Sequence, residues 1–108
     1  MNSTELVHIG GHVKICPSKI IMLKADINYT IIYLADGKQI LSSTNLGSFE
    51  KRLKEFLFFR PNRSFVINLK FISTFDDASG SSVKIRMKND ENISISRRRT
   101  AEFLKIIK

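Results

Sequence analysis

The chain contains little cysteine, proline or tryptophan, and it lacks long apolar runs. Its 108 residues include one Cys, two Pro and no Trp. A single cysteine excludes an intrachain disulfide and every zinc or redox motif that needs paired cysteines. No apolar run approaches the roughly 20 residues that cross a bilayer, and residues 1–5 lack the basic segment that opens a signal peptide. We therefore expect a cytoplasmic protein without a membrane contact.

Motifs of catalysis and metal binding are also missing. The sequence has no P-loop, no glycine-rich dinucleotide turn and no Gly-x-Ser-x-Gly. His8 and His12 have no cysteine or carboxylate cluster at a metal-binding spacing. Cys16 precedes a proline in an apolar context, which predicts an inert thiol, and Asp76-Asp77 indicates turn chemistry. The sequence therefore predicts a binding protein and not an enzyme, with no cofactor and no metal.

Positive charge is the strongest signal in the composition. Eighteen Lys and Arg oppose ten Asp and Glu, which gives a net charge of +8 and a pI near 9.9. A domain this basic matches the electrostatic footprint of a nucleic-acid-binding protein. Charge that serves solubility accounts for the same balance. Composition leaves both interpretations open, so the placement of the charge has to decide between them.

The size and the apolar residues indicate one globular domain built mainly of strands. Hydrophobic residues make up 43% and charged residues 26% of the chain, as in ordinary globular proteins. A length of 108 residues suits a single core, and many Ile with eight Phe favour a pleated sheet. We predict a single domain over residues 1–108, in which residues 1–14 could form an N-terminal hairpin extension.

Short apolar runs predict the strands. Gly10-Gly11 suits a hairpin turn between two short runs in residues 6–15, and Asp36-Gly37 is a turn signal between two further strands. Residues 83–88 alternate strictly between apolar and basic side chains, which is the pattern of a half-buried strand. Other strands are expected at residues 20–23, 29–34, 38–43, 65–67, 71–75 and 93–96, with an exposed turn at residues 76–82.

Two segments have helical periodicity. Apolar side chains recur every three or four residues over 46–58, which predicts an amphipathic helix capped by Ser43, Thr44 or Asn45. Pro61 disfavours helix, so a loop is expected at residues 60–64. A last helix is expected to begin at residues 97–99. These patterns together predict a mainly β domain of about eight to ten short strands with two short helices.

Basic residues gather in two places. One cluster comprises Arg60 and Arg63 with the cations of residues 51–54 upstream, and the other is the arginine triplet at residues 97–99. Both lie at junctions between elements, where side chains project from a rigid scaffold. The planar guanidinium suits guanine edges and phosphate oxygens. The clusters predict nucleic-acid binding, and a solvated run of charge is the alternative.

Three segments of the chain resemble the LytTR family of bacterial transcription regulators. They are IIML at residues 20–23 with NYT at 28–30 and LADGK at 34–38, FFRPNRSFVIN at 58–68, and ISRR at 95–98. The second is similar to the family's distinctive motif Phe-x-Arg-x-His-Arg-Ser. Pro61-Asn62 stands where the family has a small or apolar residue followed by His, and Asn62 cannot supply an imidazole. The order and spacing of the segments match over residues 15–104.

The resemblance implies an elongated, β-sandwich-like domain that reads DNA through loops rather than through a recognition helix. It puts three residues at base-contacting positions, namely Tyr29, Arg63 and Arg97. Nearby residues expected to contact the DNA backbone are Lys24, Asn28, Arg60, Asn62, Ser64 and Arg98. The core is expected to contain Phe65, Ile67 and Leu69.

The resemblance also implies the partners. LytTR domains recognise direct repeats in double-stranded DNA, so two copies are expected to bind side by side as a transient homodimer. Most relatives carry a receiver domain, so the chain is either part of a longer regulator or works with a receiver or sensor in trans. The alternative is a basic RNA-binding or protein-interaction module. An RNA reader exposes aromatic side chains for stacking, whereas most Phe residues here fall at core positions, which favours duplex DNA.

Overall fold

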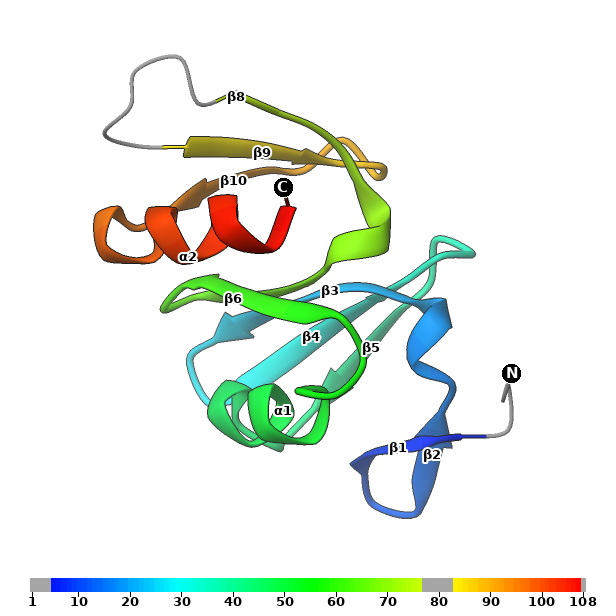
Figure 1. The fold of residues 1–108 in the computed structure, drawn as a ribbon. Coiled ribbons are helices and arrows are strands. Elements are labelled where there is room, and N and C mark those ends of the chain that lie inside the picture. The colour runs from blue at the N-terminus through cyan, green and yellow to red at the C-terminus, as the bar shows by residue number, and fades with distance from the viewer. Residues whose placement is uncertain (1–4, 77–82, 108) are drawn as a thin grey trace.

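The computed structural model describes residues 5–76 and 83–107, and strands dominate them (Figure 1). Five strands form an antiparallel sheet in the order β5-β4-β3-β7-β6. Their bounds are β3 Ile20–Asp26, β4 Tyr29–Leu34, β5 Gln39–Ser42, β6 Phe58–Asn62 and β7 Phe65–Asn68. The meander predicted over residues 20–43 is confirmed as β3, β4 and β5.

Two smaller sheets flank the five-stranded one. The hairpin predicted at Gly10-Gly11 is confirmed, because β1 and β2 pair across it and both glycines have positive φ. The other sheet has the order β10-β9-β8, and α2 follows it. The bounds are β1 Val7–Gly10, β2 Val13–Ile15, β8 Ile72–Asp76, β9 Val83–Met87, β10 Asn92–Ile95 and α2 Arg97–Ile107, with 3-10 turns at Pro17–Lys19 and Leu69–Phe71.

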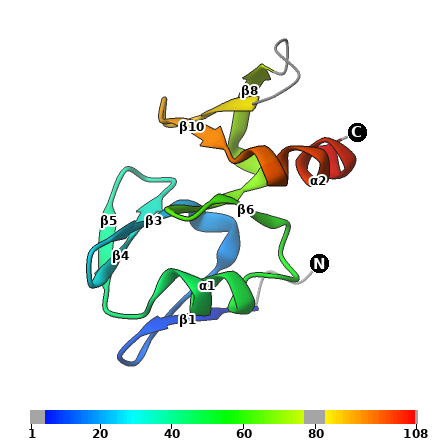
Figure 2. The ribbon, with the colours of Figure 1, turned by 90° about the vertical axis from the view of Figure 1, so that its left-hand side faces the viewer.

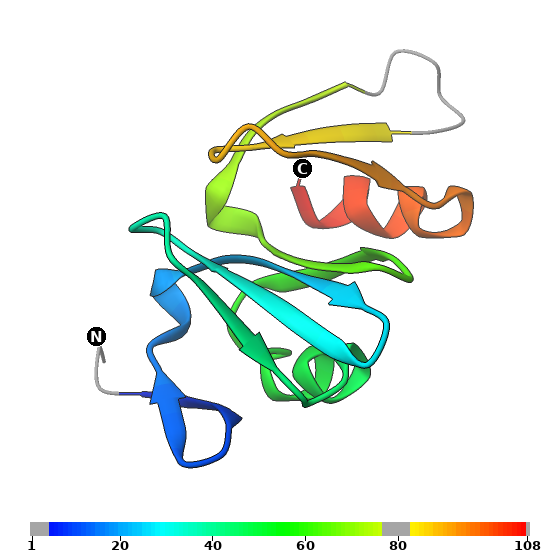
Figure 3. The ribbon, with the colours of Figure 1, turned by 180° about the vertical axis from the view of Figure 1, so that it is seen from behind.

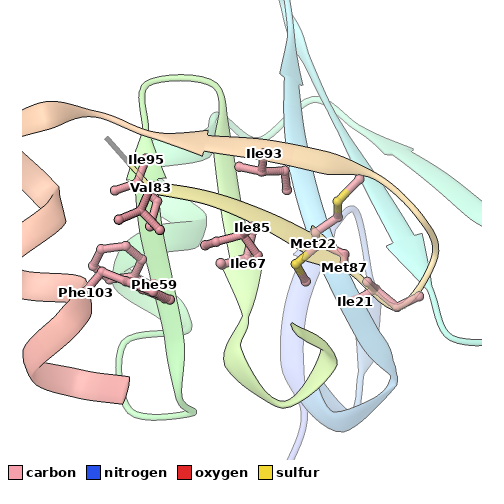
Figure 4. Packing of buried hydrophobic residues seen from close by; sticks show 10 residues of the cluster. All are labelled: Ile21, Met22, Phe59, Ile67, Val83, Ile85, Met87, Ile93, Ile95 and Phe103. Carbon is pink, nitrogen blue, oxygen red and sulfur yellow. The ribbon is translucent and has the colours of Figure 1, made fainter. Parts of the chain in front are cut away.

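The five-stranded sheet is a middle layer with a hydrophobic core on each face. One core contains Met22, Phe59 and Ile67 with side chains from β9, β10 and α2 (Figure 4). The other contains Leu23 and Val66 with side chains from β1 and α1. Val66 and Ile67 are adjacent in β7 and enter different cores because successive strand side chains point to opposite faces. Figures 1 and 3 show α1 and the β1–β2 hairpin on one side of the sheet, and the small sheet with α2 on the other.

The packed sheets confirm the predicted fold class. The Cα atoms extend over 43 × 35 × 24 Å, and within the described ranges the chain forms ten strands and two α-helices. Ile67 is fully buried, and Phe65 and Leu69 are half-buried against the same core, as predicted. Of the turn predicted at residues 76–82, Asp76 ends β8 and residues 77–82 lie outside the described residues.

The first helix is shorter than the sequence pattern predicts. Helix α1 (Leu46–Arg52) is capped by Asn45, whose side-chain oxygen accepts a hydrogen bond from the Ser48 amide at 2.8 Å. The prediction that it continues to residue 58 was wrong. Leu53 and Phe56 do reach the core, but from turns that follow the helix. The apolar spacing therefore predicted the burial of these side chains correctly, but it predicted the wrong backbone conformation for residues 53–57.

Residues 58–62, which follow the turns after α1, form a strand of the sheet. Leu57 has a φ of 62°, which an α-helix does not admit, and Phe58 pairs with Asn68 of β7. The predicted loop at residues 60–64 was wrong at its first three residues, which belong to β6. Pro61 is tolerated because β6 is an edge strand, where a missing amide hydrogen leaves no ladder bond unmade.

Candidate nucleic-acid interface

Three connections between elements lie on the same side of the molecule. The hairpin tip (residues 26–29) joins β3 to β4, the β6–β7 turn (residues 62–65) joins β6 to β7, and the α2 junction (residues 94–98) joins β10 to α2. They lie at the left in Figure 1 and at the right in Figure 3, and Figure 2 views this side directly. Each connection contains one of the three predicted base contacts: the hairpin tip has Tyr29, the β6–β7 turn has Arg63 and the α2 junction has Arg97.

Backbone hydrogen bonds link the three connections. The Ala25 amide, next to the hairpin tip, donates to the Ser64 carbonyl of the β6–β7 turn at 2.8 Å. The Ser96 amide of the α2 junction donates to the Pro61 carbonyl, next to the same turn, at 2.9 Å. The β6–β7 turn is therefore bonded to both of its neighbours. These bonds hold the three connections at fixed spacings.

The Asn62 side chain organises the β6–β7 turn. Its Oδ1 accepts a hydrogen bond from the Ser64 amide at 2.8 Å, which closes an Asx turn. Its Nδ2 donates to the Ser94 carbonyl at 2.6 Å, which is a second link to the α2 junction. Both ends of the half-buried amide thus have partners within the protein. The sequence predicts Asn62 as a contact to phosphate, and the structure shows an internal role for its side chain.

The Arg60 side chain stabilises the same turn through hydrogen bonds to its backbone. Its Nη2 donates to the Arg63 carbonyl at 2.9 Å, its Nε donates to the Asn62 carbonyl at 3.3 Å, and its Nη1 donates to Glu50 Oε1 at 3.0 Å. The Arg60 side chain is only 22% exposed. One guanidinium therefore connects α1 to the two carbonyls that precede Ser64, and its planar shape suits this arrangement of acceptors.

Glu50 connects the two basic clusters. Its Oε1 pairs with Arg60, and its Oε2 lies 4.0 Å from Arg99 Nη2 at the start of α2. Arg99 also lies 3.6 Å from Glu102 one turn further along α2. Glu50 is the only carboxylate between Asp36 and Glu55 in the sequence. That isolation was the one signal that could have identified it, and the sequence interpretation missed it.

Three other arginines of the two clusters point to solvent, whereas Arg52 donates to the His8 carbonyl at 2.9 Å. Arg63, Arg97 and Arg98 are exposed, and within residues 5–76 and 83–107 no carboxylate or carbonyl pairs with their guanidinium groups. A hollow of about 850 Å³ opens between the β6–β7 turn and the α2 junction. Its lining consists of Arg60, Asn62, Arg63, Ser64, Phe65, Ser94, Ser96, Arg98 and Arg99. The lining therefore includes Arg63 and Arg98, whose charge has no partner among the described residues, and such a concave surface suits a polyanion.

The other predicted contacts lie beside this hollow rather than in its lining. Tyr29 is 49% exposed and Asn28 is exposed at the hairpin tip. Lys24 is half-buried, with Nζ 6.0 Å from the centre of the Phe65 ring, so its ammonium group lies beside the β6–β7 turn. Arg97 begins α2. Ser94 and Ser96 were missed because they act through backbone groups, which no residue type reveals.

The side chains that could bind a metal ion do not form a cluster in the described ranges. Within residues 5–76 and 83–107 no three His, Cys, Asp or Glu side chains gather around a common point. His8 Nε2 lies 2.6 Å from the Gly11 carbonyl, inside its own hairpin. Cys16 departs from the prediction of apolar surroundings: it is half-buried, and a hydrogen bond with the Ser18 hydroxyl at 3.0 Å lowers the pKa of the thiol. None of the described helices is long and apolar enough to cross a membrane.

Comparison with known proteins identifies the family. The family profile of the LytTr DNA-binding domain matches residues 10–108. A solved structure described as the LytTr DNA-binding domain of a methyl-accepting/DNA response regulator from Bacillus cereus superposes with a TM-score of 0.76. It has 23% sequence identity, covering 99% of this chain and 98% of that one, and at this identity the likeness establishes a shared fold. No curated protein matched in a sequence comparison. Because the profile spans nearly the whole chain, the chain belongs to the LytTR family of DNA-binding domains, which act in transcription regulation.

Proposed function

We propose that this domain binds double-stranded DNA in a sequence-specific way through the hairpin tip, the β6–β7 turn and the α2 junction. The observation that carries the proposal is the pair of backbone hydrogen bonds, Ala25 to Ser64 and Ser96 to Pro61, which hold three connections on one side. Family membership supports DNA as the partner. Rigid spacing matters because side chains must meet base edges at the fixed repeat of the double helix.

In this proposal the exposed arginines read bases and their neighbours set the register. Arg63 and Arg97 donate to base edges in successive major grooves, and Tyr29 reads from the hairpin tip. Contacts to phosphate come from Lys24, Asn28, Ser64 and Arg98. Arg60 and Asn62 act at least as much through the turn that they hold, because the donors described above already have acceptors in the protein.

The proposal includes how copies assemble. Two domains bind adjacent direct repeats and contact each other only on DNA, as a transient homodimer in the cytoplasm. A receiver or sensor protein, in trans or joined to this domain, controls the binding. The net charge of +8 supports a large electrostatic contribution to DNA affinity. This contribution should weaken as the salt concentration rises, because the release of counterions from DNA then becomes less favourable.

Selection of sites from random duplexes at one stated salt concentration tests the proposal. We expect a short motif to be enriched, repeated once in the same orientation. A matched pair of variants then locates the interface. Arg63→Ala should lose the enriched motif, and Arg86→Ala should keep it, since Arg86 pairs with Asp90 and lies at the end of β9 away from the α2 junction. Enrichment of single-stranded RNA, or binding without sequence preference, would overturn the proposal.

A further inference from the structure

The side chain at the summit of the hairpin tip is an exposed isoleucine. Ile27 is 95% exposed and has a φ of 55°. Glycine, Asn and Asp are the residues that turns of this kind favour, and a positive φ is a real outlier for a β-branched side chain. The next residue, Asn28, would tolerate that conformation better, yet among the described residues Ile27 and not Asn28 has it. Local turn chemistry therefore does not explain the isoleucine.

Ile27 lies among the groups assigned to DNA. Asp26 and Tyr29 pair at the base of the tip, so Ile27 stands two residues before Tyr29 and at the same end of the hairpin. The Ala25 amide ties the hairpin to the Ser64 carbonyl, one residue from Arg63. An apolar side chain is thus held at the rim of a cationic surface. A single exposed apolar residue is ordinary by itself. Ile27 is unusual because it also has a strained backbone conformation and lies in a connection proposed to bind DNA.

We propose that Ile27 is a specificity-determining residue that contacts the C5-methyl group of a thymine in the major groove. This inference rests on the proposed function. The thymine methyl is the one apolar group that base edges present in that groove, and the other three base pairs lack it at the same position. The Ile27 side chain buries its methyl groups against the thymine methyl and removes both from water, so an A·T pair in one orientation is preferred.

Replacement of thymine by uracil tests the contact directly, because it removes only the methyl group. In the enriched duplex each thymine is changed to uracil in turn, and affinity is measured for the wild-type protein and for Ile27→Gly. We expect one position at which uracil weakens the wild type by about threefold to fivefold, the value of one buried methyl. At that position Ile27→Gly should bind the two duplexes equally. A wild type that is insensitive to uracil at every position overturns the inference.

Leu57 offers a matched control for backbone strain. It is 56% exposed and has a φ of 62°, much like Ile27, but it precedes β6 at the end of that strand away from the β6–β7 turn. Ile27→Asn and Leu57→Asn should both raise the thermal midpoint by a few degrees, since Asn tolerates positive φ. Only Ile27→Asn should abolish the response to uracil. An equal response in both variants would assign Ile27 to turn geometry.

The outcomes also separate this inference from the proposed function. If the wild-type protein shows no sequence preference on any duplex, the proposed function is wrong, and the role of Ile27 that rests on it is wrong as well. If the wild type selects a repeated motif while Ile27→Gly keeps its affinity and its profile of uracil effects, only the role of Ile27 fails.

Discussion

The two basic clusters are alike in composition and differ in how they are held. In each, one arginine is turned inward toward Glu50, while Arg63 in the first cluster and Arg97 and Arg98 in the second face solvent. Arg60 makes three hydrogen bonds of 2.9 to 3.3 Å, two of them to backbone carbonyls. Arg99 makes two longer ion pairs, at 4.0 and 3.6 Å. The β6–β7 turn is thus held by an arginine of its own cluster. The α2 junction is held instead through its backbone groups, which bond to the Pro61 carbonyl and to the Asn62 side chain.

The difference shows that the number of cations in a segment does not give their roles. The inner arginines stabilise the shape of the connections, because their charge has partners in the protein. Arg63, Arg97 and Arg98 offer charge to a ligand, because within the described part of the chain they have none. Four predictions test this division.

The largest effect is expected from the outward arginines on DNA binding. Arg63→Ala and Arg97→Ala should each weaken binding to the enriched site by about 1–3 kcal/mol, because a bidentate contact to a base is lost. Each variant should relax base preference at a different position of the motif. Titration of the enriched site and of single-base variants measures both effects. A loss that is uniform across sequences would reassign that arginine to phosphate.

The inner arginines should differ in their effect on stability. Arg60→Ala should lower the free energy of unfolding by about 1–2 kcal/mol, since it leaves two backbone carbonyls without their charged donor. Arg99→Ala should cost less than about 1 kcal/mol, because its ion pairs are long and partly exposed. Urea denaturation of the two variants beside the wild type measures the difference. Equal losses would remove the distinction between the clusters.

The Asn62 amide should prove necessary for the geometry of the turn. Asn62→Asp keeps the acceptor for the Ser64 amide and replaces the donor to the Ser94 carbonyl with an acceptor, so we expect a loss of about 1 kcal/mol in unfolding free energy. DNA affinity should fall as well, because the turn loses one of its two links to the α2 junction. Denaturation and titration on the enriched site measure the two effects.

Asn68 supplies the control for that variant. Its side chain makes the same pair of bonds, accepting from the Lys70 amide at 3.0 Å and donating to the Ile20 carbonyl at 2.9 Å, at the other end of β7. Asn68→Asp should destabilise the fold while the folded protein keeps its DNA affinity. If both variants weaken DNA binding equally, Asn62 acts only through overall stability.

The smallest effect concerns a contact to phosphate. Arg98→Ala should change the free energy of unfolding by less than about 0.5 kcal/mol, as surface substitutions do. It should make the slope of log affinity against log salt shallower by about 0.9, the value for one released counterion. Titrations at several salt concentrations measure the slope. An unchanged slope would place Arg98 outside the interface, and Lys105→Ala, on an exposed position of α2, serves as the control.

Local sequence patterns predicted the secondary structure correctly where the residue types present favour a single backbone conformation. Strict alternation predicted β9, the double glycine predicted the β1–β2 hairpin, and the start of α2 was placed correctly. The pattern over residues 46–58 failed, because turns delivered Leu53 and Phe56 to the core as well as a helix would have done. Pairing of Phe58 with Asn68 in the sheet then outweighed the local periodicity.

The candidate site divides in the same way. The sequence by itself determined that the protein is basic, mainly β and rich in arginine at two junctions, since charge, strand propensity and turn chemistry are properties of residues and their near neighbours. Only the tertiary structure decided which arginines face outward. Arg60 meets Glu50 ten residues away and Asn62 meets Ser94 thirty-two residues away, and contacts between distant segments depend on how the sheets pack rather than on any local pattern.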